Sequence, residues 1–222
     1  ITYDPIPYYP PADTSTTTGQ TDAGTDEKDD TESTGASVVD ETAVEDAIKS
    51  GEDVDVAVDD NGNAVVQEAA IAAIAAGDEA VTFDVSDPDS DTDYQIVIDP
   101  ALIEEASDIN LAMNVSIPST DNTVDGVEVP AGSIVIAPAQ KGEFGMTLEI
   151  VLPASAFADI DADLAKAFYI ADDGSVEELE LVSNADGSYS IFISHASAYV
   201  ITDVDLVAVA AEETGLDADD DD

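Results

Sequence analysis

The sequence predicts a mainly β protein of the α+β class, namely a β-sandwich with two short helices near its N-terminal side. Three observations support this prediction. Short apolar runs recur along the second half of the chain, turn sequences separate them, and only two earlier segments show clear helical spacing. Many short strands with regular turns are typical of a sandwich of two sheets. The 222 residues are 44% hydrophobic, which is enough to form a core despite a formal net charge of -48.

The two ends of the chain are predicted to lie outside the folded unit. Residues 7–37 contain no Val, Ile, Leu, Met or Phe, so they cannot bury enough apolar surface to offset the entropy of ordering them. We therefore interpret residues 1–37 as a disordered Pro/Tyr segment followed by a Thr/Asp-rich linker. Residues 207–222 end in an aspartate block typical of disordered acidic tails. The folded β-rich module is expected over residues 38–206.

Two helices are predicted before the strand-rich part of the chain. Val44, Ala47 and Ile48 recur at helical spacing, and an Ala-rich segment follows about twenty residues later. A glycine comes directly after each segment, as is common where a helix ends. The expected helices cover residues 42–50 and 67–76, and a short helical turn is expected over residues 100–106.

Alternating polarity and turn sequences predict the strands. Residues 53–58 alternate strictly, and Asn61-Gly62 then signals a hairpin. Two further strands flank an acidic loop over residues 86–93. From residue 109 onward the chain is expected to be all β, with turns at residues 172–175 and 184–188 making the last third a meander of hairpins. The strands are expected at residues 109–117, 133–138, 146–152, 166–170, 176–182, 189–194 and 198–204.

The charge balance excludes several partners. The chain has 52 acidic residues, four lysines and no arginine, so it cannot neutralise a phosphate backbone, and no nucleic-acid partner is expected. An anionic membrane would repel the chain. The chain also has no run of 18 apolar residues, so we expect no insertion into a membrane. Cysteine is absent, which excludes disulfides, thiol nucleophiles and thiolate metal sites. Residues 38–206 alone carry 37 acids and three lysines, a net charge of -34, and we expect a monomer.

An ordered series of segments resembles a known kind of module. The segments are VTFDV, NLAMNVSI, GEFGMTLEIVLP and DGSYSIFISHASAYVITD. Together they resemble a module of clostridial and ruminococcal, Gram-positive cell-surface or secreted proteins, with a C-terminal part similar to ZU5-like β-sandwich domains. In such domains a His-x-Ser-x-Tyr sequence closes the sandwich, which assigns a structural role to His195, Ser197 and Tyr199.

The resemblance implies a function and a setting. It implies a non-enzymatic extracellular spacer or interaction module, secreted or attached to the cell wall. Its partners would be neighbouring modules of the same polypeptide, together with a polysaccharide or a host or cell-surface protein. Two alternatives stay open, a carbohydrate- or calcium-binding module and an acidic protein of a halophile. The absence of arginine disfavours the halophile alternative, because salt-adapted proteins generally keep arginine.

One acidic loop is a candidate calcium site, and apart from calcium no cofactor is expected. Alternating carboxylates in a loop can converge on a hard cation. The loop differs from an EF-hand, since Thr92 and Ile98 occupy the positions that require Gly and Glu. The alternative is a solvated acidic loop without a ligand. The four candidate ligands are Asp87, Asp89, Asp91 and Asp93.

The other residue types that could form a functional site each have a structural role as an alternative. His195 is the only histidine, and its flanking serines do not lie on a strand-to-helix elbow, so we expect a structural residue rather than a general base. Acidic pairs are too numerous to indicate a glycosidase. Four tyrosines are candidates either for carbohydrate binding or for packing: Tyr94, Tyr169, Tyr189 and Tyr199. Lys49, Lys141 and Lys166 are candidates for an isopeptide bond to asparagine or, alternatively, are exposed charges.

Overall fold

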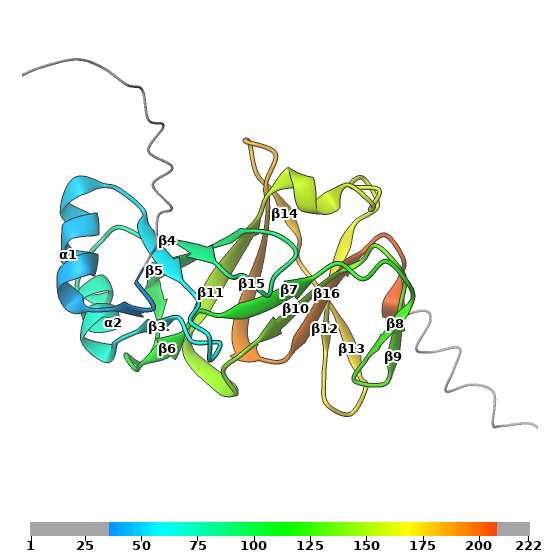
Figure 1. Ribbon diagram of the computed structural model, residues 1–222, viewed down its shortest axis with the longest axis horizontal. Helices are drawn as coiled ribbons and strands as arrows, with labels where there is room; N and C mark the ends of the chain where they lie inside the picture. The colour runs from blue at the N-terminus through cyan, green and yellow to red at the C-terminus, as the bar shows by residue number, and fades with distance from the viewer. Residues whose placement is uncertain (1–35, 208–222) are drawn as a thin grey trace, which may run out of the picture. The chain divides into compact units, whose positions relative to one another are not determined.

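The computed structural model describes residues 36–207, which form four β-sheets and two short α-helices (Figure 1). This confirms the predicted mainly β fold class with two short helices near the N-terminal side. The predicted linker and tail lie outside the described residues, except for residues 36, 37 and 207. None of the helices within residues 36–207 is long and apolar enough to cross a bilayer.

Two large sheets form the body of the fold. The six-stranded sheet has the order β14 (Val182–Ser183), β15 (Tyr189–Ala196), β11 (Gly142–Leu152), β5 (Tyr94–Ile103), β4 (Val81–Ser86) and β2 (Val54–Ala57). The five-stranded sheet has the order β13 (Val176–Leu179), β12 (Lys166–Ile170), β16 (Ala198–Thr202), β10 (Ile134–Pro138) and β7 (Met113–Ser116). Neighbouring strands are antiparallel in both sheets, apart from the parallel pair of β2 and β4.

The two large sheets bury their facing surfaces in a common core. Phe83, Ile96, Ile150 and Ile191 are aligned across four strands of the six-stranded sheet, and all four are buried. They belong to one hydrophobic cluster with residues of β7, β10 and β16. Alternation along a strand places every second side chain on the same face. The sheets therefore pack as a sandwich, as the sequence predicts.

The helices and a small sheet complete this core at the β2–β4–β5 side (Figure 1). Helix α1 (Glu41–Ser50) begins where the Asp40 carboxylate accepts a hydrogen bond from the Ala43 N–H at 3.0 Å, and it ends at Gly51 with a φ of 71°. Helix α2 (Glu68–Ala75) buries Ile71 and Ile74. The small sheet has the order β1 (Val38–Val39), β3 (Val65–Val66) and β6 (Ile109–Asn110).

A hairpin that the sequence did not predict covers the outer face of the five-stranded sheet. It consists of β8 (Asn122–Val124) and β9 (Val127–Val129). The turn between them has positive φ at Asp125 and Gly126, 46° and 87°, as two-residue hairpin turns of the primed type require. Val127 and Val129 form a second cluster with Phe168, Val200 and Leu206. The three central strands of the five-stranded sheet, β10, β12 and β16, are thus buried on both faces.

Several predicted elements are wrong in extent or in pairing. The helical turn expected at residues 100–106 is wrong, because β5 continues through residue 103 to pair with β11 beyond a bulge. The single strand expected at residues 109–117 divides into β6 and β7, which belong to different sheets. Likewise, the strand expected at residues 176–182 divides into β13 and β14.

The predicted hairpin at Asn61-Gly62 and the predicted meander are wrong, because strands that follow one another in the sequence belong to different sheets. Asn61-Gly62 does form a turn, in which the Asp59 carboxylate accepts hydrogen bonds from the N–H groups of Asn61 and Asn63. However, β2 and β3 on either side of this turn lie in different sheets. In the last third only the hairpins β12–β13 and β14–β15 pair directly, while the chain changes sheet between them. Turn chemistry is local, whereas the choice of sheet depends on distant strands.

Candidate functional sites

The acidic loop between β4 and β5 is bonded to the backbone around it. The Asp87 carboxylate accepts hydrogen bonds from the Asp89 N–H at 2.9 Å and from the Ser90 hydroxyl at 3.1 Å. The Asp91 carboxylate accepts one from the Ile117 N–H at 2.7 Å. Two of the four predicted calcium ligands therefore stabilise the loop conformation and its attachment.

The same loop attaches the six-stranded sheet to the edge strand β7 of the five-stranded sheet. The Asp91 N–H donates to the Val115 carbonyl oxygen at 2.7 Å, and the Val115 N–H donates to the Ser90 hydroxyl at 3.0 Å. Asp93 lies apart from these contacts, beside the groove described below. The four aspartates are not brought together, and residues 36–207 contain no group of three or more His, Cys, Asp or Glu residues arranged to hold a metal ion. Calcium binding stays a prediction.

The His-x-Ser-x-Tyr sequence lies where the chain passes from one large sheet to the other. His195 is the next-to-last residue of β15 in the six-stranded sheet, and Tyr199 lies on β16 in the five-stranded sheet. The Tyr199 hydroxyl donates a hydrogen bond to the His195 carbonyl oxygen at 2.5 Å. This geometry is that of a tyrosine corner, in which a tyrosine hydroxyl bonds to the backbone a few residues upstream.

Hydroxyl groups surround the His195 ring. Its Nδ1 lies 3.3 Å from both the Ser197 and the Tyr199 hydroxyl oxygens, and its edge meets the Tyr169 ring at a centroid distance of 4.7 Å. Burial, with Tyr169 nearby, raises the pKa of Tyr199 well above its ordinary value. A catalytic base would instead be oriented by a third group toward a nucleophile. The contacts of His195 therefore indicate a structural role in the tyrosine corner that joins the two sheets.

Two of the four candidate tyrosines are buried, and two are partly exposed. Tyr94 and Tyr199 are each 2% exposed, so the interpretation of these two as sugar-binding platforms is wrong. The Tyr94 hydroxyl donates to the Leu111 carbonyl oxygen at 3.2 Å and accepts from the Met113 N–H at 2.8 Å. Burial raises the pKa of Tyr94 well above its ordinary value. Tyr189 packs against Phe157 with ring centroids 4.1 Å apart.

The candidate isopeptide lysines lie at the surface. Lys49 pairs with Glu45 at 3.1 Å on α1, and Lys141 is exposed. Lys166 lies 2.9 Å from a Glu178 carboxylate oxygen and also pairs with Asp205. These positions agree with the alternative that the three lysines are surface charges.

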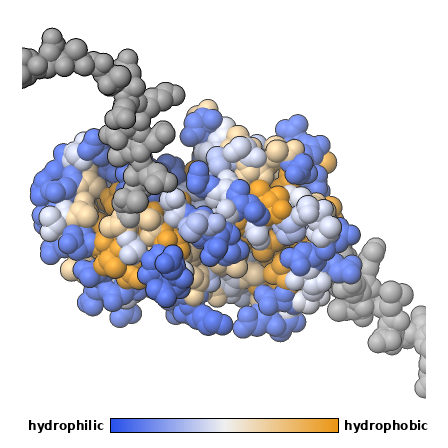
Figure 2. All heavy atoms as spheres, in the orientation of Figure 1, coloured by the Kyte–Doolittle hydropathy of each residue, from blue (hydrophilic) through white to orange (hydrophobic). Residues whose placement is uncertain are grey.

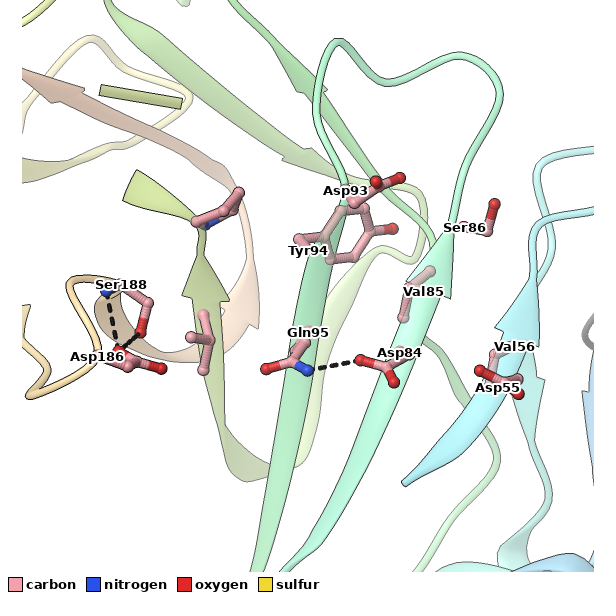
Figure 3. Close-up of a pocket in the computed structure, with 12 residues that line it drawn as sticks. Asp55, Val56, Asp84, Val85, Ser86, Asp93, Tyr94, Gln95, Asp186 and Ser188 are labelled. Atoms are coloured by element: carbon pink, nitrogen blue, oxygen red, sulfur yellow. Dashed lines mark hydrogen bonds between the residues drawn. The ribbon is translucent and has the colours of Figure 1, made fainter. Parts of the chain in front are cut away.

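The structure reveals a groove on the outer face of the six-stranded sheet (Figure 3). Its volume is about 550 Å³. Asp55, Asp84, Gln95 and Val151 are aligned in register on four adjacent strands, β2, β4, β5 and β11. Asp186 and Ser188, from the turn before β15, bound one end, and Asp93 and Ser86 lie beside the central strands (Figure 3).

The lining of this groove combines carboxylates with apolar side chains. It includes four aspartates and no lysine among the residues that the structure describes there. The Gln95 side-chain amide donates to the Asp84 carboxylate at 2.6 Å. Asp186 accepts hydrogen bonds from the Ser188 N–H and hydroxyl, which lower its pKa. Sequence reasoning missed the groove because its residues come from five separate segments.

Comparison with known proteins adds no relative. No family model, curated protein or solved structure matches this chain. The resemblance to Gram-positive surface modules therefore depends on the sequence segments alone.

Proposed function

We propose that the folded unit is a non-enzymatic extracellular module that acts as a spacer or interaction unit within a larger bacterial surface or secreted protein. The observation that carries this proposal is the position of the first and last described residues in the folded unit. Strand β1 enters beside α1 in the small sheet, whereas Leu206 packs with Val127 and Val129 beneath the β8–β9 hairpin. Figure 1 shows these two places at opposite ends of the folded unit. A unit with this geometry separates whatever precedes it from whatever follows it.

Both ends are bonded into sheets, which supports a role in carrying load. Val38 and Val39 pair with Val65 and Val66 in parallel register, and the Gln67 N–H donates to the Val39 carbonyl oxygen at 3.0 Å. At the other end, β16 lies inside the five-stranded sheet and pairs with β10 on one side and β12 on the other. Tension at either end must therefore act on several hydrogen bonds and on the core at once.

The charge distribution also supports a soluble module that keeps apart from its copies. The 37 acids and three lysines of residues 38–206 give a net charge of -34. Hydrophilic residues cover much of the visible face, with apolar patches between them (Figure 2). Like charge of this size favours solubility and disfavours self-association. The resemblance to secreted modules supports the extracellular setting.

Single-molecule pulling tests the proposal. The chain lacks cysteine, so Ser37→Cys with Val207→Cys gives unique handles at the two ends of the folded unit. We expect one cooperative unfolding event that releases roughly 580 Å of chain, the extended length of the residues between the handles. The matched control, Glu128→Cys with Val207→Cys, applies force to the β8–β9 hairpin and the chain end near it, and should yield at lower force. Unfolding of the end-to-end pair in several small steps at low force would contradict the spacer role.

A binding survey tests the carbohydrate alternative separately. Saturable binding of the chain to one class of polysaccharide, with or without calcium, would replace the spacer proposal with a carbohydrate-binding function. A result of no saturable binding to any polysaccharide would leave the neighbouring modules or a cell-surface protein as the partners of the spacer.

A further inference from the structure

We infer that the groove on the outer face of the six-stranded sheet docks an extended, lysine- or arginine-bearing segment of a partner protein. This inference goes beyond the spacer proposal, because it assigns a specific binding surface and the chemistry of its partner. It rests on three features of the groove: its open face, its length across the sheet, and the distribution of its charges.

The face that carries the groove is open in the part of the chain that the structure describes. Buried and partly exposed residues alternate along β4, β5 and β11. All of the fully buried ones, such as Phe83 and Ile96, lie on the inner face. On the outer face Phe192 is 40% exposed. The corresponding outer face of the five-stranded sheet is instead covered by the β8–β9 hairpin. Of the two large sheets, the six-stranded one thus offers an open face to a partner within residues 36–207.

The length of the groove suits an extended chain. Its aligned positions run from Asp55 on β2 through Asp84, Gln95 and Val151 to the turn that precedes β15. Neighbouring strands lie about 4.8 Å apart, so five strands span roughly 19 Å. An extended peptide covers this distance in about six residues. Figure 3 shows Asp186 and Asp55 at opposite ends of this line, with Gln95 and Asp84 between them.

The negative charges of the groove are spread along it, so that several separate cationic groups of one partner can each meet a carboxylate. The four carboxylates come from four different segments: β2, β4, the turn before β15, and the loop that ends at β5. Ammonium and guanidinium groups form their strongest hydrogen bonds with carboxylates. Between the carboxylates, Val151 and Pro153 provide apolar surface along which the methylene stems of lysine or arginine can lie. A second copy of this chain is a poor occupant, because its own net charge is strongly negative.

The test compares two double variants that change the net charge equally. Asp84→Asn with Asp93→Asn removes two charges from the groove and keeps the shape of both side chains. Asp60→Asn with Asp172→Asn removes two exposed charges that do not line it. The probe is a fluorescent Lys-Thr-Lys-Thr-Lys-Thr peptide at about 0.15 M salt, where distant exposed charges are largely screened. Unfolding midpoints of both double variants, measured in parallel, verify that each remains folded.

We expect the groove variant to raise the peptide Kd by about tenfold or more relative to the control variant. Hydrogen exchange with bound peptide should slow within residues 81–86 and 94–97. Equal loss of affinity in the two double variants, or protection elsewhere on the molecule, would overturn the docking site, as would failure of the unmodified chain to bind the peptide. Any of these results leaves the pulling experiment unaffected, so the two proposals fail independently.

Discussion

The two large sheets differ in how many of their faces are buried. The outer face of the five-stranded sheet packs Phe168, Ile170 and Val200 under the β8–β9 hairpin. The outer face of the six-stranded sheet carries Asp84, Gln95, Glu149 and Phe192, all at least partly exposed. Both sheets contribute their inner faces to the same core. The central strands of the five-stranded sheet therefore pack against other parts of the fold on both faces, whereas the six-stranded sheet has one open face that a partner can contact.

The strand sequences reflect this difference. The strands β10, β12 and β16 read IVIAP, KAFYI and AYVIT, nearly continuous apolar runs such as occur in strands buried on both faces. By contrast, β4 reads VTFDVS, where polar residues recur at alternate positions. The apolar composition of β10, β12 and β16 thus agrees with their place at the centre of the covered sheet, whereas the edge strands β7 and β13, MNVS and VEEL, contain polar residues.

The largest expected effect comes from equal truncations on the two outer faces. Phe168 is 0% exposed and Phe192 is 40% exposed. Phe168→Ala should lower the free energy of unfolding by about 3–5 kcal/mol, because it leaves a cavity beneath the hairpin. Phe192→Ala should cost less than about 1 kcal/mol. Urea unfolding measures both, and equal costs would mean that the two faces are equally buried.

The next largest effect concerns the tyrosine that links the two sheets from inside. Tyr94 lies on β5, and its hydroxyl bonds to the backbone of Leu111 and Met113 beside β7. Tyr94→Phe leaves two buried backbone groups without a partner, so we expect a loss of about 2–3 kcal/mol. Tyr169→Phe is the control and should cost less than about 0.5 kcal/mol. A neutral effect of Tyr94→Phe in urea unfolding would contradict the link.

The same tyrosines predict an alkaline dependence of stability. Burial raises the pKa values of Tyr94 and Tyr199 in the folded state, whereas an unfolded tyrosine ionises near pH 10. The unfolded state therefore loses protons first as the pH rises above about 10, so the contribution of these two tyrosines to the free energy of unfolding should be constant below that pH and fall above it. Tyr94→Phe should reduce the slope above pH 10. An unchanged slope would show that Tyr94 titrates normally.

A smaller effect is expected in the acidic loop that joins the two sheets. Asp91→Ala removes the carboxylate that accepts from the Ile117 N–H, and we expect a cost of about 1 kcal/mol. The Asp89 side chain has no such bond in the structure, so Asp89→Ala is the control and should change little. Chemical unfolding with chelator and with calcium measures both variants. Calcium stabilisation that disappears in both variants would instead support a calcium site in this loop.

The smallest effect is expected for the groove itself. Asp84→Asn keeps an oxygen that can accept from Gln95 and removes one negative charge from an acidic surface. We expect its unfolding free energy to stay within about 0.5 kcal/mol of the unmodified chain. Thermal unfolding tests this, and a loss of several kcal/mol would mean that Asp84 is a structural residue rather than part of a binding surface.

Local signals in the sequence predict local structure well. The N-terminal helix and the turns at Gly174 and Gly187 form where the sequence indicates, because caps and turn residues act within a few positions. The fold class follows from the many short strands. Strand pairing does not follow, since β2 pairs with β4 in parallel across α2, and β8–β9 packs on strands far along the chain.

The candidate sites show the same limit. The aspartates of the 87–93 loop are conspicuous in the sequence, yet Asp87 and Asp91 bond to the loop itself and to the backbone beyond β7. Asp55 and Asp84 gave no sequence signal, because only the register between β2 and β4 places them side by side. A site assembled from several strands needs the pairing before it can be recognised.

Thiol accessibility tests the difference between the two sheets most directly. Val97 on β5 and Val200 on β16 both point to the outer face of their own sheet, and the chain has no cysteine of its own. We expect Val97→Cys to react with a thiol reagent in the folded protein, whereas Val200→Cys should react only when the protein unfolds. Equal protection of the two thiols would contradict an open face on the six-stranded sheet.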